Sequence, residues 1–129
     1  MSRIIETLQG INGLVSTGGV SEEEVDAYEK EHGITFSSEY KEYLMSFGVA
    51  SCDCHELTGI SKSKRLDVFA NTAKWREKNN QIPIDYYVVE DLNIDDAVIW
   101  QDKKGEIYQT VGNSIPMKIA ESFADYLLG

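Results

Sequence analysis

Val20-Ser21-Glu22-Glu23-Glu24-Val25 opens the stretch of sequence that decides the fold. Ser21 and Glu24 have the spacing of a capping box, in which the serine hydroxyl accepts from the Glu24 amide and the carboxylate reaches back to the Ser21 amide. Val20 and Val25 hold the two positions of a hydrophobic staple, which fixes the angle at which the chain enters a helix. Gly33 can end that helix, because glycine takes the left-handed conformation without steric cost. These residues predict a short helix between Ser21 and Gly33.

A second short helix is predicted directly after the first. It starts at Ser37-Ser38, and Gly48 stops it. Four apolar residues between these signals recur at i, i+3, i+4 and i+7, the spacing of one buried helix face. They are Tyr40, Tyr43, Leu44 and Phe47. No enzyme signature accompanies this helix pair.

On either side of the pair the signals are weaker. Four apolar residues near the start have helical spacing, namely Ile4, Leu8, Ile11 and Val15. Gly10 and Gly13 oppose a helix there, since each costs ~1 kcal/mol in a helix interior. After the pair, residues 49–60 indicate an irregular strand region. Asp67 is placed to cap a third helix that runs to about Asn79, with Trp75 on its inward face.

Strands dominate the second half of the chain. Tyr86-Tyr87-Val88-Val89 is typical of a short buried strand. Residues 97–101 and 106–111 flank Asp102-Lys103-Lys104-Gly105, a sequence that suits a type I turn with a glycine bulge. Pro116 separates this sheet from a last helix with one apolar stripe, formed by Ile119, Phe123, Tyr126 and Leu127. Helices at both ends with strands between them predict an α+β fold, in which N-terminal helices and a C-terminal helix pack on an antiparallel sheet.

Length and composition place the chain among ordinary globular proteins. It has 129 residues, of which 42% are hydrophobic, and a single domain over residues 1–129 is the most economical organisation. No apolar run approaches the ~18 residues of a membrane span. Met1-Ser2-Arg3 leads into Ile4-Ile5-Glu6 and not into a signal-peptide core. We therefore expect a cytoplasmic protein that does not bind membranes.

Charge is the next constraint. The 22 acidic and 12 basic side chains give a net charge of −10, which disfavours affinity for nucleic acid and favours a basic partner or simple solubility. One acidic group lies on the helix pair, and a second is formed by Glu90, Asp91, Asp95 and Asp96. A basic segment, residues 62–78, lies between the two groups. Its contact with nucleic acid is a weaker alternative, because few aromatic residues are present there to stack on bases.

Taken in order, these elements resemble the Smi1/Knr4 family of the SUKH superfamily. The resemblance covers about residues 20–129. The segments that carry it are Ser21-Glu22-Glu23-Glu24-Val25 with Tyr28-Glu29, Gly33-Ile34-Thr35-Phe36, Tyr40-Lys41-Glu42-Tyr43-Leu44, the strand at 86–89, the strand of Trp100, Gly105-Glu106-Ile107-Tyr108 and Ser122-Phe123-Ala124-Asp125-Tyr126-Leu127. The sequence departs from the family pattern at Ser37, where a proline is usual, and at residues 92–96, where a glycine-rich turn is common.

The resemblance implies a binding protein and no enzyme. Bacterial proteins of this kind are mostly immunity proteins that neutralise toxin domains, often nucleases, and fungal relatives are scaffolding regulators of cell-wall synthesis. An acidic protein would complement a nuclease toxin, which is cationic because it holds phosphates. We expect a cognate basic toxin domain as partner, with no cofactor and no metal. A regulatory or scaffolding protein-binding module is the alternative.

The expected contact surface is an acidic rim around buried aromatic anchors. We place the rim on the second acidic group, next to the exposed edge of the strand region. Trp100 is the candidate anchor, although a tryptophan on a strand face is also typical of a core.

Cys52-Asp53-Cys54-His55 is the one cluster with metal-ligand or nucleophilic character. On a strand, Cys52 and Cys54 would share a face and His55 would point to the other. A zinc site normally takes four ligands, and only His32 remains as a further histidine. We therefore expect strand packing, with a redox-sensitive thiol pair, a metal site or a Cys-His enzyme as alternatives.

Overall fold

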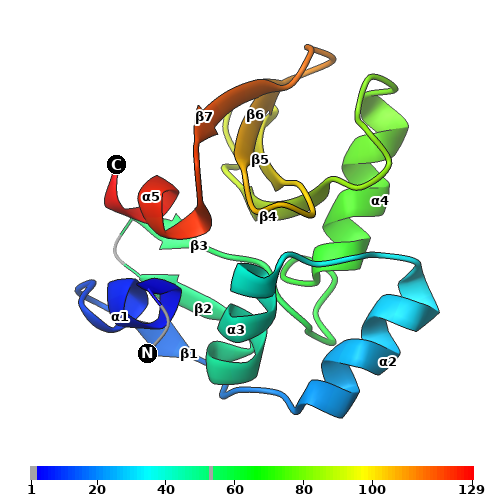
Figure 1. Ribbon diagram of the computed structural model, residues 1–129. Coiled ribbons are helices and arrows are strands. Elements are labelled where there is room, and N and C mark those ends of the chain that lie inside the picture. The colour runs from blue at the N-terminus through cyan, green and yellow to red at the C-terminus, as the bar shows by residue number, and fades with distance from the viewer. Residues whose placement is uncertain (1–2, 53) are drawn as a thin grey trace.

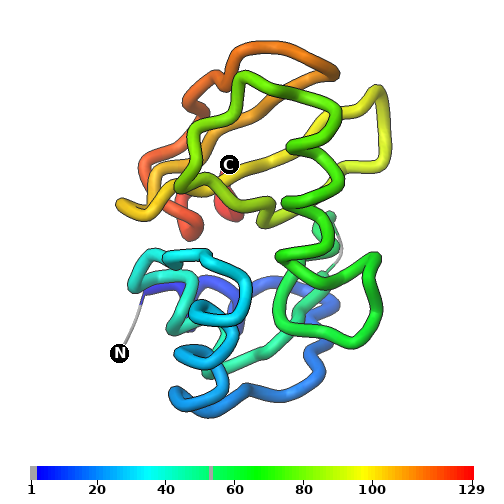
Figure 2. Tube along the Cα trace, turned by 90° about the vertical axis from the view of Figure 1, so that its right-hand side faces the viewer, coloured from blue at the N-terminus to red at the C-terminus, as the bar shows by residue number. Residues whose placement is uncertain are grey.

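The fold combines helices with two antiparallel sheets, so the predicted α+β class is confirmed (Figure 1). The computed structural model describes residues 3–52 and 54–129. One layer holds α1 to α3 with β1 to β3, and β4 to β7 form the other with α4 beside them (Figures 1 and 2). The elements are α1 (Arg3–Gln9), β1 (Val15–Ser16), α2 (Glu22–His32), α3 (Ser38–Phe47), β2 (Ala50–Cys52), β3 (His55–Glu56), α4 (Val68–Lys78), β4 (Tyr87–Asp91), β5 (Ala97–Gln101), β6 (Ile107–Val111), β7 (Met117–Ala120) and α5 (Phe123–Leu128).

The predicted helix pair is confirmed, and its caps differ from the prediction only in one contact of the capping box. At the start of α2 the Ser21 hydroxyl accepts from the Glu24 amide at 3.1 Å. The Glu24 carboxylate accepts from that hydroxyl at 3.4 Å, in place of the expected Ser21 amide. Gly33 ends α2 in the left-handed conformation, with φ of 67°. Ser37 caps α3 by accepting from the Tyr40 amide at 3.1 Å.

The first helix is shorter than its apolar spacing predicts. α1 buries Ile4 and Leu8 and ends before Gly10. Val15 lies in β1, where it is 66% exposed, so the prediction that the helical spacing reaches Val15 is wrong. The physical reason lies in the two glycines, because Gly13 adopts φ of 75°, outside the helical region.

The two sheets are linked into one strand system. Their orders are β1-β2-β3 and β4-β5-β6-β7, and every neighbouring pair is antiparallel. An isolated bridge joins Leu57 to Glu90, and the Thr58 amide donates to the Val89 carbonyl at 2.9 Å. The outer side of β4 is therefore covered by the segment that follows β3.

The β5–β6 hairpin follows the chemistry of its turn residues, as predicted. Asp102 Oδ1 accepts from the backbone amides of Lys104, Gly105 and Glu106 at 3.0, 2.9 and 2.9 Å. Gly105 has φ of 103°, a conformation that side-chain-bearing residues rarely adopt.

The segment after Pro116 forms a strand before it forms a helix. Residues 117–120 are β7, with Met117 opposite Gln109 of β6. The predicted last helix is present as α5, but it begins only at Phe123. Ile119 lies in β7 and is 41% exposed, so its assignment to the helix stripe is wrong. Apolar residues at 115, 117 and 119 repeat every second residue, which is the period of a strand.

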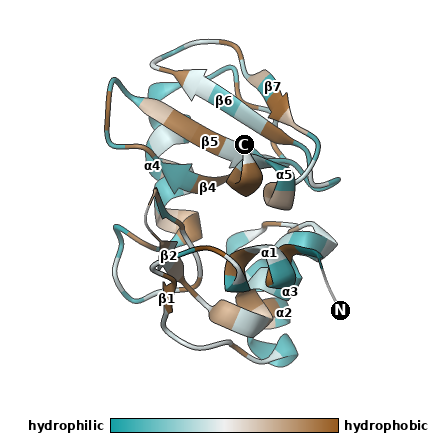
Figure 3. Cartoon of the chain, turned by 90° about the vertical axis from the view of Figure 1, so that its left-hand side faces the viewer, coloured by the Kyte–Doolittle hydropathy of each residue, from teal (hydrophilic) through white to brown (hydrophobic). Residues whose placement is uncertain are grey.

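The core lies on both faces of the β4–β7 sheet. On one face Ile99 and Ile107 belong to a cluster shared with α1, α3 and α5. On the other face Val98 and Trp100 pack with Trp75 of α4. Figure 3 shows how far hydrophobic residues extend along β5, the strand buried on both faces.

Tyrosine hydroxyls satisfy the polar groups inside the larger cluster. The hydroxyl of Tyr40 lies 2.8 Å from Thr58 Oγ1, and that of Tyr43 donates to the Thr58 carbonyl at 2.5 Å. Tyr87 accepts from the Ser37 amide at 2.9 Å. Burial raises the pKa of all three tyrosines above the ordinary range.

None of the helices in the described ranges combines the length and the hydrophobicity needed to cross a bilayer.

Candidate functional site

The acidic connection between β4 and β5, residues 92–96, is a fixed turn built without glycine. Three of its residues have positive φ, namely Asn93 (58°), Asp95 (54°) and Asp96 (56°). Asparagine and aspartate enter the left-handed region more readily than other side-chain-bearing residues. The Asn93 amide donates to Asp91 Oδ1 at 2.9 Å, and the Ala97 amide donates to the Ile94 carbonyl at 2.9 Å. The turn holds the side chains of Asp95 and Asp96 in solvent.

Helix α4 faces this turn with cations. Trp75 Nε1 donates to Asp91 Oδ2 at 3.0 Å, and Lys74 Nζ lies 3.9 Å from the same oxygen. The ammonium groups of Lys74 and Lys78 lie 5.0 and 4.8 Å from the centre of the Trp75 ring. With Asp95 and Asp96, these residues line a hollow of about 220 Å³. The tertiary structure thus brings the basic segment and the second acidic group together.

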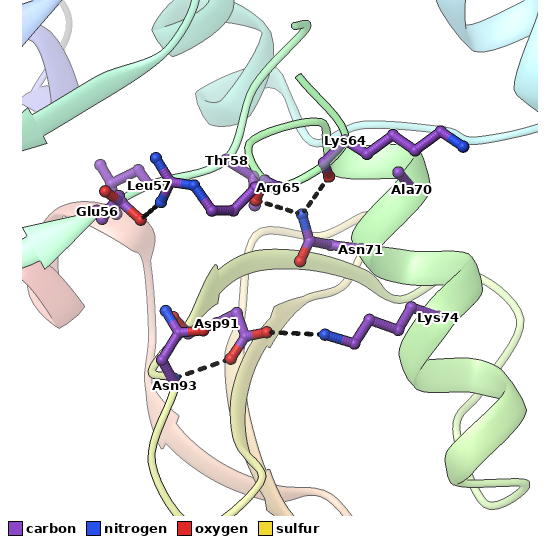
Figure 4. A pocket seen from close by; sticks show the side chains of 10 residues that line it. All are labelled: Glu56, Leu57, Thr58, Lys64, Arg65, Ala70, Asn71, Lys74, Asp91 and Asn93. Atoms are coloured by element: carbon purple, nitrogen blue, oxygen red, sulfur yellow. Dashed lines mark hydrogen bonds and ion pairs between the residues drawn. The ribbon is translucent and has the colours of Figure 1, made fainter. Parts of the chain in front are cut away.

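A larger cavity of about 330 Å³ lies on the other side of Lys74, between α4, β3 and the end of β4 (Figure 4). Its walls carry both signs of charge. Arg65 forms an ion pair with Glu56, and Lys74 reaches toward Asp91 (Figure 4). Asn71 donates to the Arg65 carbonyl at 3.0 Å and so holds the preceding loop against α4. Arg65 and Lys74 each face a carboxylate, whereas Lys64 belongs to none of the described ion pairs, so the lining has one cation more than it has carboxylates.

Two of the residues expected at the contact surface are buried. Glu90 is 3% exposed and Trp100 0%. Trp100 Nε1 donates to Thr110 Oγ1 at 2.9 Å inside the core. The expectation that these two side chains lie at the surface is corrected, because β4 and β5 are covered on both faces. Asp91 is half-buried, and of the four acids expected at the rim only Asp95 and Asp96 are exposed; their part in partner binding stays a prediction.

The Glu90 carboxylate organises the joint between the two sheets. Its Oε1 lies 2.8 Å from His55 Nδ1 and accepts from the Tyr126 hydroxyl at 2.6 Å. Its Oε2 accepts from the Glu56 amide at 2.8 Å. Burial raises the pKa of Tyr126, and the neighbouring carboxylate raises it further. Glu90 is thus a structural acid, because both of its carboxylate oxygens have hydrogen-bond partners within the fold.

Cys52 is the last residue of β2, and Cys54 directly precedes β3. Cys52 pairs with His55 of β3 and Cys54 lies outside the strands, so the expectation that Cys52 and Cys54 share one face of a strand is wrong. Asp53 lies outside the described residues. Burial raises the pKa of the Cys52 thiol, opposed by hydrogen bonds to the backbone of Cys54 and His55. A raised pKa leaves little thiolate at neutral pH, and the thiolate is the nucleophile. Among the residues that the structure describes, no three His, Cys, Asp or Glu side chains converge on a metal-sized site.

The acids of α2 form a separate exposed group. Glu22, Glu23, Glu24 and Asp26 are all exposed, and within the described residues none of them belongs to an ion pair. Three of them lie in the first turn, where the positive end of the helix dipole accounts for them. Asp95 and Asp96 are likewise outside the described ion pairs, but they do not lie at the start of a helix, so no helix dipole accounts for acidic residues at these positions.

Sequence reasoning missed one surface. Four exposed apolar side chains surround β7, and we call them the β7 strip: Val111, Ile115, Met117 and Ile119, exposed by 49, 73, 69 and 41%. The apolar residues at 115, 117 and 119 alternate as in a strand and could have indicated this surface, but the sequence-based prediction places Ile119 on the last helix.

The comparisons with known proteins place the chain in a family. The family model SUKH_5, described as SMI1-KNR4 cell-wall, matches residues 1–129, the whole chain. A search of curated proteins finds no match.

Proposed function

Because the chain belongs to the SMI1-KNR4 (SUKH) family, we propose that it is an immunity-type protein. In this proposal it binds a cognate basic toxin domain, such as a nuclease, in the cytoplasm and blocks it by occlusion. It catalyses no reaction of its own.

The observation that supports this proposal is the pair of exposed carboxylates at Asp95 and Asp96. They stand on a fixed turn, are exposed, and take part in none of the described ion pairs. By contrast, Glu90 is buried and bonded to His55, Glu56 and Tyr126. Acids that contribute little to the fold are available to a partner, and the net charge of −10 would attract a cationic one.

The electrostatics match what a nuclease toxin requires of its inhibitor. A nuclease carries cations to hold phosphates, and an acidic inhibitor gains faster association and charge complementarity from them. Complete occlusion needs roughly 1,600 Å² of total buried surface. An interface of that size would extend from the turn at residues 92–96 onto a neighbouring face.

The test begins with the affinity-tagged chain, which is used to isolate its stoichiometric partner from native lysate. The partner's domain is then expressed in a heterologous cell, with and without the chain. We expect growth arrest without the chain, recovery with it, and a one-to-one complex by light scattering. A Cys52→Ser/Cys54→Ser variant should protect equally well, because occlusion needs no thiol.

Three results would count against the proposal. If the partner stays toxic at a saturating concentration of the chain, the proposal is overturned. A stoichiometric partner without toxic activity favours the regulatory or scaffolding module instead. Loss of protection in a folded Cys52→Ser/Cys54→Ser variant would point to thiol chemistry.

A further inference from the structure

We infer that β7 is a docking edge, to which an extended segment of a cationic protein adds as a further β-strand. The inference rests on the proposed function and assigns it a surface. Three independent features of β7 lead to it.

The first feature is the open side of the strand. β7 pairs with β6 on one side, and within residues 3–52 and 54–129 no strand pairs with its other side. The opposite end of this sheet is different, because Leu57 bridges to β4 there. Figure 1 shows β7 as the outermost strand of its sheet. An unpaired edge presents backbone donors and acceptors to any chain that can pair with them.

The second feature is the apolar side chains along that edge. Ile99 of β5 pairs with Gln109 of β6, and Gln109 pairs with Met117 of β7. Side chains in such a row share one face of the sheet. Exposure rises along it, from 1% at Ile99 to 69% at Met117. The β7 strip therefore continues the core face beyond the part that α5 covers, and Figure 3 shows β7 as hydrophobic.

The third feature is charge, which identifies the occupant. The Gly112 amide donates to the Asp96 carbonyl at 3.1 Å, so the Asp95–Asp96 pair lies beside the β6 end of the strip. Glu121 follows the other end, with 74% of its side chain exposed. Lys118 Nζ is held by Glu106 and Glu121 at 2.7 and 2.9 Å, so these three side chains together leave one net negative charge at this end. A segment with alternating apolar residues and lysine or arginine at its ends complements this edge.

The same charges disfavour a second copy of the chain. Antiparallel pairing of two β7 strands would bring the Asp95–Asp96 end of one copy against Glu121 of the other. Each copy also carries a net charge of −10, and like charges repel across an interface. A cationic partner meets no such repulsion.

The experiment measures binding of the full chain to an array of short synthetic peptides. In one set Val, Ile or Phe alternates with Thr, with Lys or Arg at the ends; in the matched set Asp or Glu replaces the basic residues. We expect binding to members of the basic set. Hydrogen exchange of the chain should slow at the backbone amides of residues 117–120 when such a peptide is present. If the chain binds neither the basic nor the acidic peptide set, or binds both equally, the inference is refuted.

Two pairs of variants test the surface. Met117→Lys/Ile119→Lys should weaken binding by about tenfold or more, whereas Val15→Lys/Ile84→Lys should leave it unchanged. The control pair alters two exposed apolar residues elsewhere, 66 and 90% exposed, and gives the same net charge. Asp95→Asn/Asp96→Asn should slow association at low salt by about threefold, and Glu22→Gln/Glu23→Gln should slow it less. If the two variants of the first pair weaken binding equally, β7 is not part of the site. If the two variants of the second pair slow association equally, the turn at residues 92–96 is not part of it.

The outcomes for the docking edge and for the proposed function are separable. A toxin that the chain inhibits, with exchange protection away from residues 117–120, overturns only the docking edge. Peptide binding at β7 without any inhibited toxin overturns only the immunity role. Dimers of the chain that Met117→Lys/Ile119→Lys dissociates would replace the cationic occupant with a second copy.

Discussion

Glu39 of α3 holds the start of α5, because its Oε1 accepts from the Phe123 amide at 2.8 Å. The second oxygen accepts from the Ala124 amide at 3.0 Å, and Gln101 Nε2 of β5 donates to Oε1 at 3.0 Å. One carboxylate thereby joins three elements that are far apart in the sequence. A helix as short as α5 does not form alone in water, so its position depends on this contact and on burial of Phe123.

Replacing Glu39 should therefore destabilise the fold. We expect Glu39→Ala to lower the free energy of unfolding by about 2–3 kcal/mol, because two amides of α5 and the Gln101 amide lose a charged acceptor. Urea unfolding followed by circular dichroism measures this. Glu23→Ala, at an exposed acid of α2, should stay within about 0.5 kcal/mol of the parent. Equal effects of the two substitutions would show that the Glu39 contacts contribute no net stability.

Gly59 should tolerate no side chain. A Cβ there would lie 1.9 Å from the Gly48 carbonyl oxygen, which is backbone and cannot move without displacing the end of α3. We expect Gly59→Ala to cost more than about 3 kcal/mol, and so to lower the thermal midpoint strongly or to prevent folding. Gly10→Ala is the matched control, since its nearest backbone atom would be 3.6 Å away. A Gly59→Ala protein with parental stability would contradict the close approach.

Alkaline pH should unfold the protein cooperatively. Burial raises the pKa of Tyr40, Tyr43 and Tyr87 in the folded state, while an unfolded tyrosine titrates near about 10. The stability they contribute is fully present below about pH 10. It falls as the pH rises toward the folded values, because the unfolded state releases those protons first.

The measurement compares tyrosinate absorbance with circular dichroism during an alkaline titration. For the buried tyrosines, absorbance should appear together with the loss of structure. Complete tyrosine ionisation in a protein that keeps its circular dichroism would contradict the burial.

The two cysteines should differ in reactivity. Cys54 is exposed, whereas Cys52 is partly buried and its burial raises the pKa of its thiol, so less of Cys52 is present as the reactive thiolate at neutral pH than in an ordinary cysteine. With limiting iodoacetamide at neutral pH, mass spectrometry should find the label first on Cys54. The two rates should become similar in concentrated urea. Faster labelling of Cys52 in the folded protein would contradict this assignment.

The helix caps and the β5–β6 turn could be predicted because their determinants are local. The caps at Ser21 and Ser37 bond to amides three residues away, and the Asp102 turn closes within four residues. The same applies to Asp67, whose side chain accepts from the Ala70 amide at the start of α4 as predicted. The family followed from the ordered set of these elements.

Residue chemistry alone thus specified where helices and turns begin and end, together with the α+β class and the acidic surplus. Tertiary packing decided which acidic side chains are buried and bonded and which stay exposed. Glu90 and Asp95 look alike in the sequence, but the first is enclosed by His55 and Tyr126, 35 and 36 residues away. Tertiary structure also decided that β7 has an open edge, since whether a strand is outermost depends on the order of the whole sheet. Burial and edge exposure arise from contacts between distant segments, and no local spacing encodes them.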